Sequence, residues 1–255
     1  MNEVLFLAWQ DPETRGWYPV GRLSRDDGVY RFVYTKGAKR SKRFIPFGRM
    51  QDVTAAYESR ELFPLFANRL LTKQRPEYKD FLDWLNVQDN EDDPLALLAR
   101  TGGTRQTDTL MVFPCPSKSD GMYRTKFFAQ GLRYLSACSI SAVNQISAGA
   151  RLFLMPDPQN EHDRLAIALR TTDPKTLVGY CPSYLTEDFR RLLRARTHAV
   201  VVTAERVNAS APIQLRLLCD LVAPWPRTFR PCSTNDFKPL ARAKRRSLSH
   251  ASAAR

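Results

Sequence analysis

The stretch "PDPQNEHDRLAIAL", Pro156–Leu169, divides into a polar half and an apolar half. The polar half is rich in Asp and Asn, which form tight turns because their side chains hydrogen-bond to nearby backbone amides. The apolar half alternates like a strand with one buried face, on which we expect Leu165, Ile167 and Leu169. The stretch therefore predicts a polar turn at the rim of a sheet, followed by a strand that enters the core.

The polar half also has a second interpretation, as a chemical site. Asp157, His162 and Asp163 are residue types of metal centres and of acid/base pairs. An Asp-Pro-x-Asn turn already accounts for the carboxylates, and the other two histidines, His198 and His250, lie elsewhere in the sequence. We therefore expect no metal, no cofactor and no catalytic residue, and we predict that the protein is not an enzyme.

The charge of the chain indicates what it binds. Its 255 residues carry 39 Lys and Arg against 26 Asp and Glu, which gives a net charge of +13. A clustered positive charge of this size favours polyanions, of which nucleic acids are the most common class. A basic protein without such a partner is the alternative. The apolar fraction of 43% is that of a folded protein.

The cysteines and the apolar runs indicate the compartment. Five cysteines are widely spaced and form no C-x-x-C pair, so we expect reduced thiols rather than disulfides or a zinc ribbon. No apolar run approaches the ~20 residues that span a bilayer, and the first residues do not resemble a signal peptide. The sequence predicts a cytoplasmic protein that does not interact with membranes.

Residues 1–114 show strands first and helices afterwards. Residues 17–34 alternate on both sides of Asp26-Asp27-Gly28, which predicts a β-hairpin. Helical spacing follows in residues 61–70 and 78–85, and a third helix is predicted from Asp93-Pro94 to Gly102-Gly103. We expect a β/α module here, which ends before the Pro- and Ser-rich segment at 116–121.

Residues 122–223 alternate as a series of strands with one helix, predicted for residues 183–196. From Pro224 the pattern ends in a Pro-rich and then basic segment, so we expect residues 224–255 to form a disordered basic tail. The predicted fold class is therefore α+β, with an N-terminal β/α module, a second β-rich module and a tail.

The second module resembles a HIRAN domain. The matching motifs are "GLRYL" (131–135), "LFLMPDPQNEHDRLAIAL" (152–169) and "VGYCPSYL" (178–185), in the family's order and spacing. The resemblance implies a small OB-like β-barrel that binds single-stranded DNA at a free 3′ end. In the family, aromatic side chains stack on a base, and a turn Asp contacts the terminal hydroxyl.

The resemblance also implies which residues form the site. Arg133 and Tyr134 correspond to the family's leading basic and aromatic pair, and Asp163 to the turn Asp. His162 stands where the family has Tyr, and Glu161 places a negative charge beside the proposed site. The nucleic-acid-binding residues are expected to be Arg133, Tyr134, Asn160, His162, Asp163, Arg164, Tyr180 and Ser183.

Residues 1–114 more faintly resemble the N-terminal subdomain of HipA-like toxin kinases, through segments 20–34, 61–78 and 93–103. No kinase motif follows, so this resemblance implies a docking or supporting module rather than phosphoryl transfer. Our leading prediction is a non-enzymatic protein that binds single-stranded DNA or DNA ends through its second module. The alternative is a regulatory module of a toxin–antitoxin or phage-defence system that docks a HipA-like kinase as its protein partner.

Overall fold

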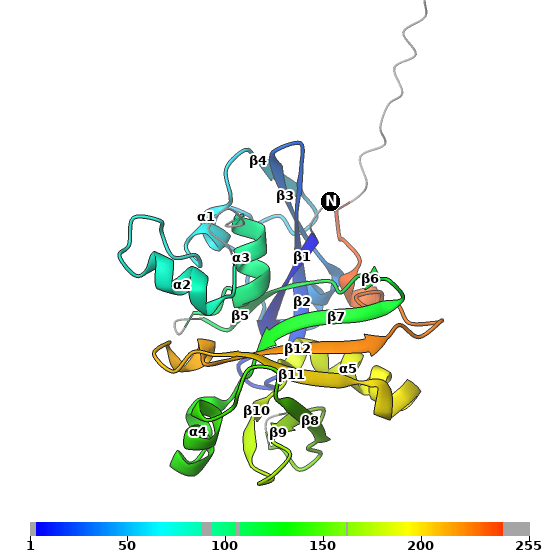
Figure 1. Ribbon diagram of the computed structural model, residues 1–255. Helices are drawn as coiled ribbons and strands as arrows, with labels where there is room; N and C mark the ends of the chain where they lie inside the picture. Colours follow the sequence, from blue (N-terminus) through cyan, green and yellow to red (C-terminus); the bar gives the residue numbers. More distant parts are fainter. Residues whose placement is uncertain (1–3, 88–92, 106–107, 162, 242–255) are drawn as a thin grey trace, which may run out of the picture.

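Two antiparallel sheets organise the chain in the computed structural model, which describes residues 4–87, 93–105, 108–161 and 163–241 (Figure 1). The first sheet has the strand order β4-β3-β2-β1-β5, and the second has the order β10-β9-β8-β11-β12-β7-β6. The first sheet therefore uses the N-terminal half of the chain and the second the C-terminal half.

The first sheet is centred on the predicted hairpin. Its strands are β1 (Val4–Gln10), β2 (Trp17–Asp26), β3 (Val29–Tyr34), β4 (Ala56–Ser59) and β5 (Leu110–Pro114). Asp27 and Gly28 turn the chain with φ of 47° and 75°, which is the conformation that a two-residue hairpin requires. Alternate residues of β3, from Tyr30 through Phe32 to Tyr34, are buried, so this face forms the core of the first module.

Three short helices cover that core: α1 (Pro64–Ala67), α2 (Tyr78–Trp84) and α3 (Pro94–Thr101). The Asp93 carboxylate caps α3 by accepting the Leu95 amide at 2.8 Å, and Gly102 ends the helix with φ of 71°. These are the predicted boundaries of that helix. Within the described chain, no helix is long and apolar enough to cross a membrane.

The second sheet closes on itself as a barrel. Its strands are β6 (Lys118–Ser119), β7 (Met122–Phe128), β8 (Arg151–Pro156), β9 (Ile167–Arg170), β10 (Leu177–Tyr180), β11 (Val201–Val207) and β12 (Leu217–Pro224). Just beyond β7, Gln130 and Tyr180 exchange two backbone hydrogen bonds of 2.8 and 2.9 Å. This bridge joins the β7 segment to β10 at the other edge, which gives the OB-like fold.

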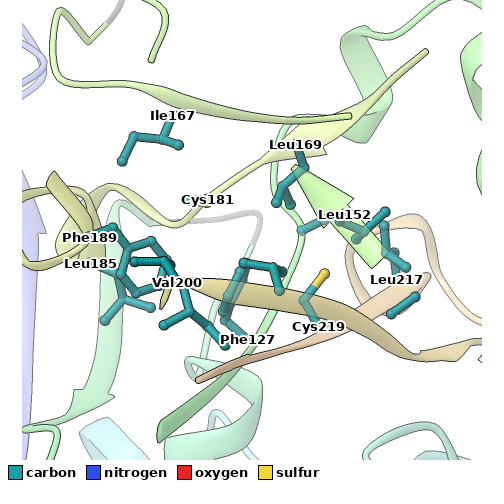
Figure 2. Close-up of a cluster of buried hydrophobic side chains, with 14 of the residues drawn as sticks. Phe127, Leu152, Ile167, Leu169, Cys181, Leu185, Phe189, Val200, Leu217 and Cys219 are labelled. Carbon is teal, nitrogen blue, oxygen red and sulfur yellow. The ribbon is translucent and has the colours of Figure 1, made fainter. Parts of the chain in front are cut away.

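Helix α5 (Ser183–Arg196) occupies the predicted helical segment and packs against the barrel core through Leu185 and Phe189 (Figure 2). Leu192 of the same helix belongs to this core. The core also contains Phe127, Ile167 and residues from the other strands. A further helix, α4 (Ala137–Asn144), was not predicted. Its apolar residues do not form a clear helical stripe, although Ser136 caps it by accepting the Ser139 amide.

The strand that follows the quoted turn begins later than predicted. Leu165 is 47% exposed, whereas residues 166–169 are buried. The Asp163 carboxylate accepts the Leu165 amide at 2.8 Å, and its carbonyl accepts the Ala166 amide at 2.9 Å. The turn therefore extends through Leu165, and the prediction that Leu165 belongs to the buried strand is wrong.

The two modules share an apolar interface. Phe81 and Leu82 of α2 pack in one buried cluster with Phe128 of β7 and Leu218 of β12. At the edge of this cluster the buried Asn208 amide donates to the Trp84 carbonyl at 2.9 Å. Buried apolar area and a satisfied buried amide both disfavour separation of the modules.

The predicted disordered tail is wrong for residues 224–241. Trp225 and Phe229 pack on the barrel core, and Phe237 makes an edge contact with Phe6 of β1 at 4.9 Å. The Leu240 amide then donates to the Tyr34 carbonyl at 2.8 Å. We call residues 226–241 the C-terminal strap, because they run from the barrel back to the first sheet. The aromatic side chains explain why this Pro-rich segment packs. Residues 242–255 lie outside the described residues.

Candidate nucleic-acid interface

The quoted turn lies on a rim of the barrel, beside the bridge that closes it. Three segments meet there: the turn at 156–165, the segment 129–134 that includes the 3-10 helix η2 (Leu132–Tyr134), and the end of β10. We call these segments the barrel rim. They bring predicted site residues from distant parts of the sequence onto one surface.

Two glycines allow the close approach at this rim. A Cβ on Gly179, whose φ is 141°, would lie 2.9 Å from the Cβ of Ala129. A Cβ on Gly131, whose φ is 75°, would lie 3.2 Å from the Tyr180 ring. A side chain at Gly179 would push the two segments apart, whereas one at Gly131 would displace the Tyr180 ring slightly and strain a backbone of positive φ, so glycine favours closure at both positions.

Tyr180 connects all three segments of the rim. Its backbone pairs with Gln130, its ring contacts Gly131, and its hydroxyl donates to the Asp157 carboxylate at 3.1 Å. Burial raises the pKa of Tyr180, and the hydrogen bond to Asp157 raises it further. The half-buried Tyr180 side chain therefore links the three segments of the rim.

The turn itself is a network of side chain to backbone hydrogen bonds. Asn160 accepts the Asp163 amide at 3.0 Å and donates to the Asp157 carboxylate at 3.3 Å. Asp163 accepts the Leu165 amide through one carboxylate oxygen, as described above. These contacts fix Asn160 and Asp163 in the turn and hold the Asp163 carboxylate at the rim. His162 lies outside the described residues.

Tyr134 is the aromatic residue that the rim offers to solvent. It is 74% exposed at the end of η2. The Arg133 guanidinium lies 4.7 Å from the centre of its ring, which is a cation–π contact. An exposed ring on a short, hydrogen-bonded turn can stack on a planar group without first leaving the core.

Helix α5 supplies the last predicted residues. Ser183 is its first residue, three positions after Tyr180, and the first turn contains no acidic side chain. Arg190 of α5 donates to the Leu165 and Arg164 carbonyls at 3.1 and 3.2 Å, which fixes the end of the quoted turn. The exposed Arg164 side chain and the amides at the start of α5 therefore lie next to the rim and favour an anion there.

Sequence reasoning missed the residues that assemble the rim. Gly131, Gly179 and Arg190 act through backbone approach and carbonyl contacts, and Gly179 gave the clearest signal because it adjoins the predicted site residue Tyr180. Among the described residues, no group of three or more His, Cys, Asp or Glu side chains is placed to hold a metal ion.

The comparisons with known proteins concern the part of the chain that contains the barrel rim. Residues 122–225 match the family model of the HIRAN domain. The barrel is a HIRAN domain. The resemblance of residues 1–114 to the HipA-like subdomain receives no support from the comparisons.

Two solved structures align with part of the chain. The crystal structure of the HIRAN domain of human HLTF aligns at 16% identity with a TM-score of 0.31, over 40% of this chain and 74% of its own. A protein from Lactobacillus plantarum aligns at 15% identity and the same TM-score, over 40% of this chain and 99% of its own. Neither score is high enough to establish a shared fold. A search of the curated proteins gives no match.

Proposed function

We propose that the protein binds single-stranded DNA, or a single-stranded DNA end, at the rim of its HIRAN barrel, without catalysis. HIRAN domains are generally DNA-binding modules. The observation that carries the proposal is the 74% exposed ring of Tyr134, held on a short turn beside the Arg133 guanidinium. Stacking of a base on such a ring stabilises binding by ~1–3 kcal/mol.

The neighbouring groups suit the rest of a nucleotide. Arg133, Arg164 and the first amides of α5 can each approach a phosphate, because cations and helix N-termini bind anions. The Asp163 carboxylate can accept a hydrogen bond from a terminal hydroxyl but would repel a terminal phosphate. A free 3′ hydroxyl is therefore the end that we expect the rim to prefer.

Two observations support a binding role without catalysis. Burial raises the pKa of the Cys181 and Cys219 thiols, which opposes formation of the thiolate that a cysteine nucleophile needs. The carboxylates of the turn are engaged with backbone amides and with Tyr180. The alternative of a module that docks a HipA-like kinase depended on the N-terminal resemblance, and no contact favours it.

Replacement of Tyr134 by Ala tests the proposal. We expect single-strand affinity to fall about tenfold in fluorescence anisotropy, which corresponds to the loss of about 1.4 kcal/mol. Tyr134→Phe should retain most of the affinity, because stacking needs the ring rather than the hydroxyl. Met155→Ala, which shortens another exposed apolar side chain of this barrel, is the matched control. Unchanged affinity in a folded Tyr134→Ala variant would refute the site.

Asp163→Asn tests the end preference separately. The natural protein should bind a 3′-hydroxyl oligonucleotide more tightly than the same oligonucleotide with a 3′ phosphate. The Asn side chain does not repel the phosphate, so the variant should discriminate less between the two ends. Equal discrimination by both proteins would remove Asp163 from the proposed contact while leaving the stacking test unaffected.

A further inference from the structure

A second charged surface lies on the first module, in the segment between β3 and β4. Residues 36–49, which we call the basic loop, contain no Asp or Glu. Its cations are Lys36, Lys39, Arg40, Lys42, Arg43 and Arg49, and all six are exposed. The rim of the HIRAN barrel does not use these residues.

Hydrogen bonds and close packing against β2 fix the backbone of the basic loop. The buried Tyr34 hydroxyl donates to the Met50 carbonyl at 2.8 Å and accepts the Phe47 amide at 2.7 Å. The buried Asp11 carboxylate accepts the Ser41 hydroxyl at 2.6 Å. At Gly37 a Cβ would lie 2.0 Å from the Pro19 carbonyl oxygen, so the loop lies directly on β2. Side chains on a fixed backbone lose less entropy on binding.

The basic loop has more cations than carboxylates to pair with them. Arg43 is paired with Asp11 and Glu13, and Arg40 lies 3.8 Å from Asp236. In the ion pairs of the described residues, three carboxylates thus face the six cations of the loop. The exposed side chains of Arg40, Lys42 and Arg43 line an open hollow together with Tyr18 and the buried Asp11, so cations outnumber the carboxylate around this concave surface.

The C-terminal strap adds to this charge. The Lys36 amide donates to the Lys238 carbonyl at 2.9 Å, and the Lys36 ammonium donates to the Asn235 side chain at 3.2 Å. The last described residues therefore lie beside the basic loop. The exposed Lys238 thus places a further cation beside the basic loop, although it lies about 200 positions away in the sequence.

We propose that the basic loop and Lys238 bind the phosphate backbone of nucleic acid, as a second surface separate from the rim. Backbone binding needs cations at several positions rather than contacts to base edges, and this surface supplies them. An anionic membrane would need more apolar side chains, whereas Ile45 is the only large apolar residue of the loop that is strongly exposed.

The test uses a blunt duplex whose 3′ ends carry phosphates, so that it offers no free 3′ hydroxyl. The full chain with Lys39→Gln, Lys42→Gln and Arg49→Gln should bind this duplex at least tenfold more weakly in anisotropy at low salt. The slope of log affinity against log salt should become shallower by about 0.9 for each phosphate that the variant no longer neutralises.

The matched control changes the net charge equally at exposed lysines elsewhere: Lys79→Gln, Lys118→Gln and Lys175→Gln. We expect this triple variant to change affinity by less than twofold. Equal reductions of affinity in both triple variants would overturn the proposal, because the effect would then come from total charge. Tyr134→Ala should leave binding of the blocked duplex unchanged, so this surface and the rim are tested independently.

The last measurement is binding of the loop triple variant to phosphatidylserine vesicles. If the loop triple variant no longer binds vesicles but keeps its duplex affinity, the surface binds acidic lipid and the proposal is overturned. Weaker duplex binding by a loop variant whose circular dichroism and melting temperature match those of the control variant supports the proposal.

Discussion

The barrel rim and the basic loop are both held by a tyrosine hydroxyl, yet they expose opposite chemistry. At the rim, Tyr180 bonds to Asp157, and the surface shows an aromatic ring among carboxylates and arginines. At the basic loop, Tyr34 bonds to the backbone at Phe47 and Met50, and the surface shows mainly cations.

The two surfaces are therefore suited to different parts of a nucleic acid. A ring beside a carboxylate can distinguish an unstacked base or a terminal hydroxyl from other groups. A cluster of cations attracts any phosphate backbone regardless of sequence. The two proposed surfaces would therefore combine an end-selective contact with a general one in one molecule.

The largest expected effect is a loss of stability. It concerns the barrel rather than the basic loop, because the substitution disturbs the contact that closes the barrel. Gly179→Ala should lower the free energy of unfolding by about 3 kcal/mol, because the new Cβ meets Ala129 at 2.9 Å and φ is 141°. Gly149→Ala is the control, because its φ is also positive, at 82°, but no atom lies within 4 Å of its Cβ, and it should cost about 1 kcal/mol. Urea unfolding measures both, and equal costs would show that closure does not depend on this approach.

The second effect concerns Asp188, which lines a pocket together with Phe113 of β5. Burial raises the pKa of Asp188 on α5 to about 6, although Arg191 lowers it. In the unfolded chain the carboxyl ionises near pH 4, so the folded state loses stability as pH rises from about 4 to about 6. Asp188→Asn should therefore be more stable by about 2 kcal/mol above pH 6 and no different below pH 4. A stability difference that is constant with pH would contradict this assignment.

The third effect compares the two tyrosines directly. Tyr34→Phe leaves a buried amide and a buried carbonyl without their partner, so it should cost about 1.5 kcal/mol. Tyr180→Phe should cost about 0.5 kcal/mol, because water can reach the half-buried Asp157 carboxylate. Thermal melting of both variants measures which substitution costs more stability. The reverse order would mean that the rim depends more on its tyrosine than the loop does.

The smallest effect concerns the negative charge of the rim. Glu161 is exposed in the quoted turn, so Glu161→Gln should tighten single-strand binding by about twofold at low salt. The gain should disappear near physiological salt, because exposed charges are screened. Duplex binding at the basic loop should not change. A gain that persists at high salt would indicate a direct contact instead of a long-range field.

Local features of the fold could be predicted from the sequence because they depend on neighbouring residues. The Asp93 cap, the Gly102 stop and the Asp27-Gly28 hairpin turn all act within a few positions of the chain. Helix α5 shows its apolar face every three or four residues and has the predicted bounds.

Features that depend on distant contacts could not be predicted. The bridge between Gln130 and Tyr180 and the contact between Tyr34 and Leu240 give no periodic signal. The exposure of Tyr134 was equally invisible, since the pattern alone does not separate a surface ring from a core ring. The strap was misjudged because its prolines outweighed its aromatic residues in the prediction.

The C-terminal strap also has a consequence for the order of assembly during synthesis. Tyr34 leaves the ribosome about 200 residues before its partner Leu240, and the whole barrel is made in between. Domains generally fold in the order of synthesis. The first sheet is therefore made before the strap residues that pair with the Lys36 amide and the Tyr34 carbonyl. The strap contacts are therefore expected to form after the barrel, as a late step that completes the first module.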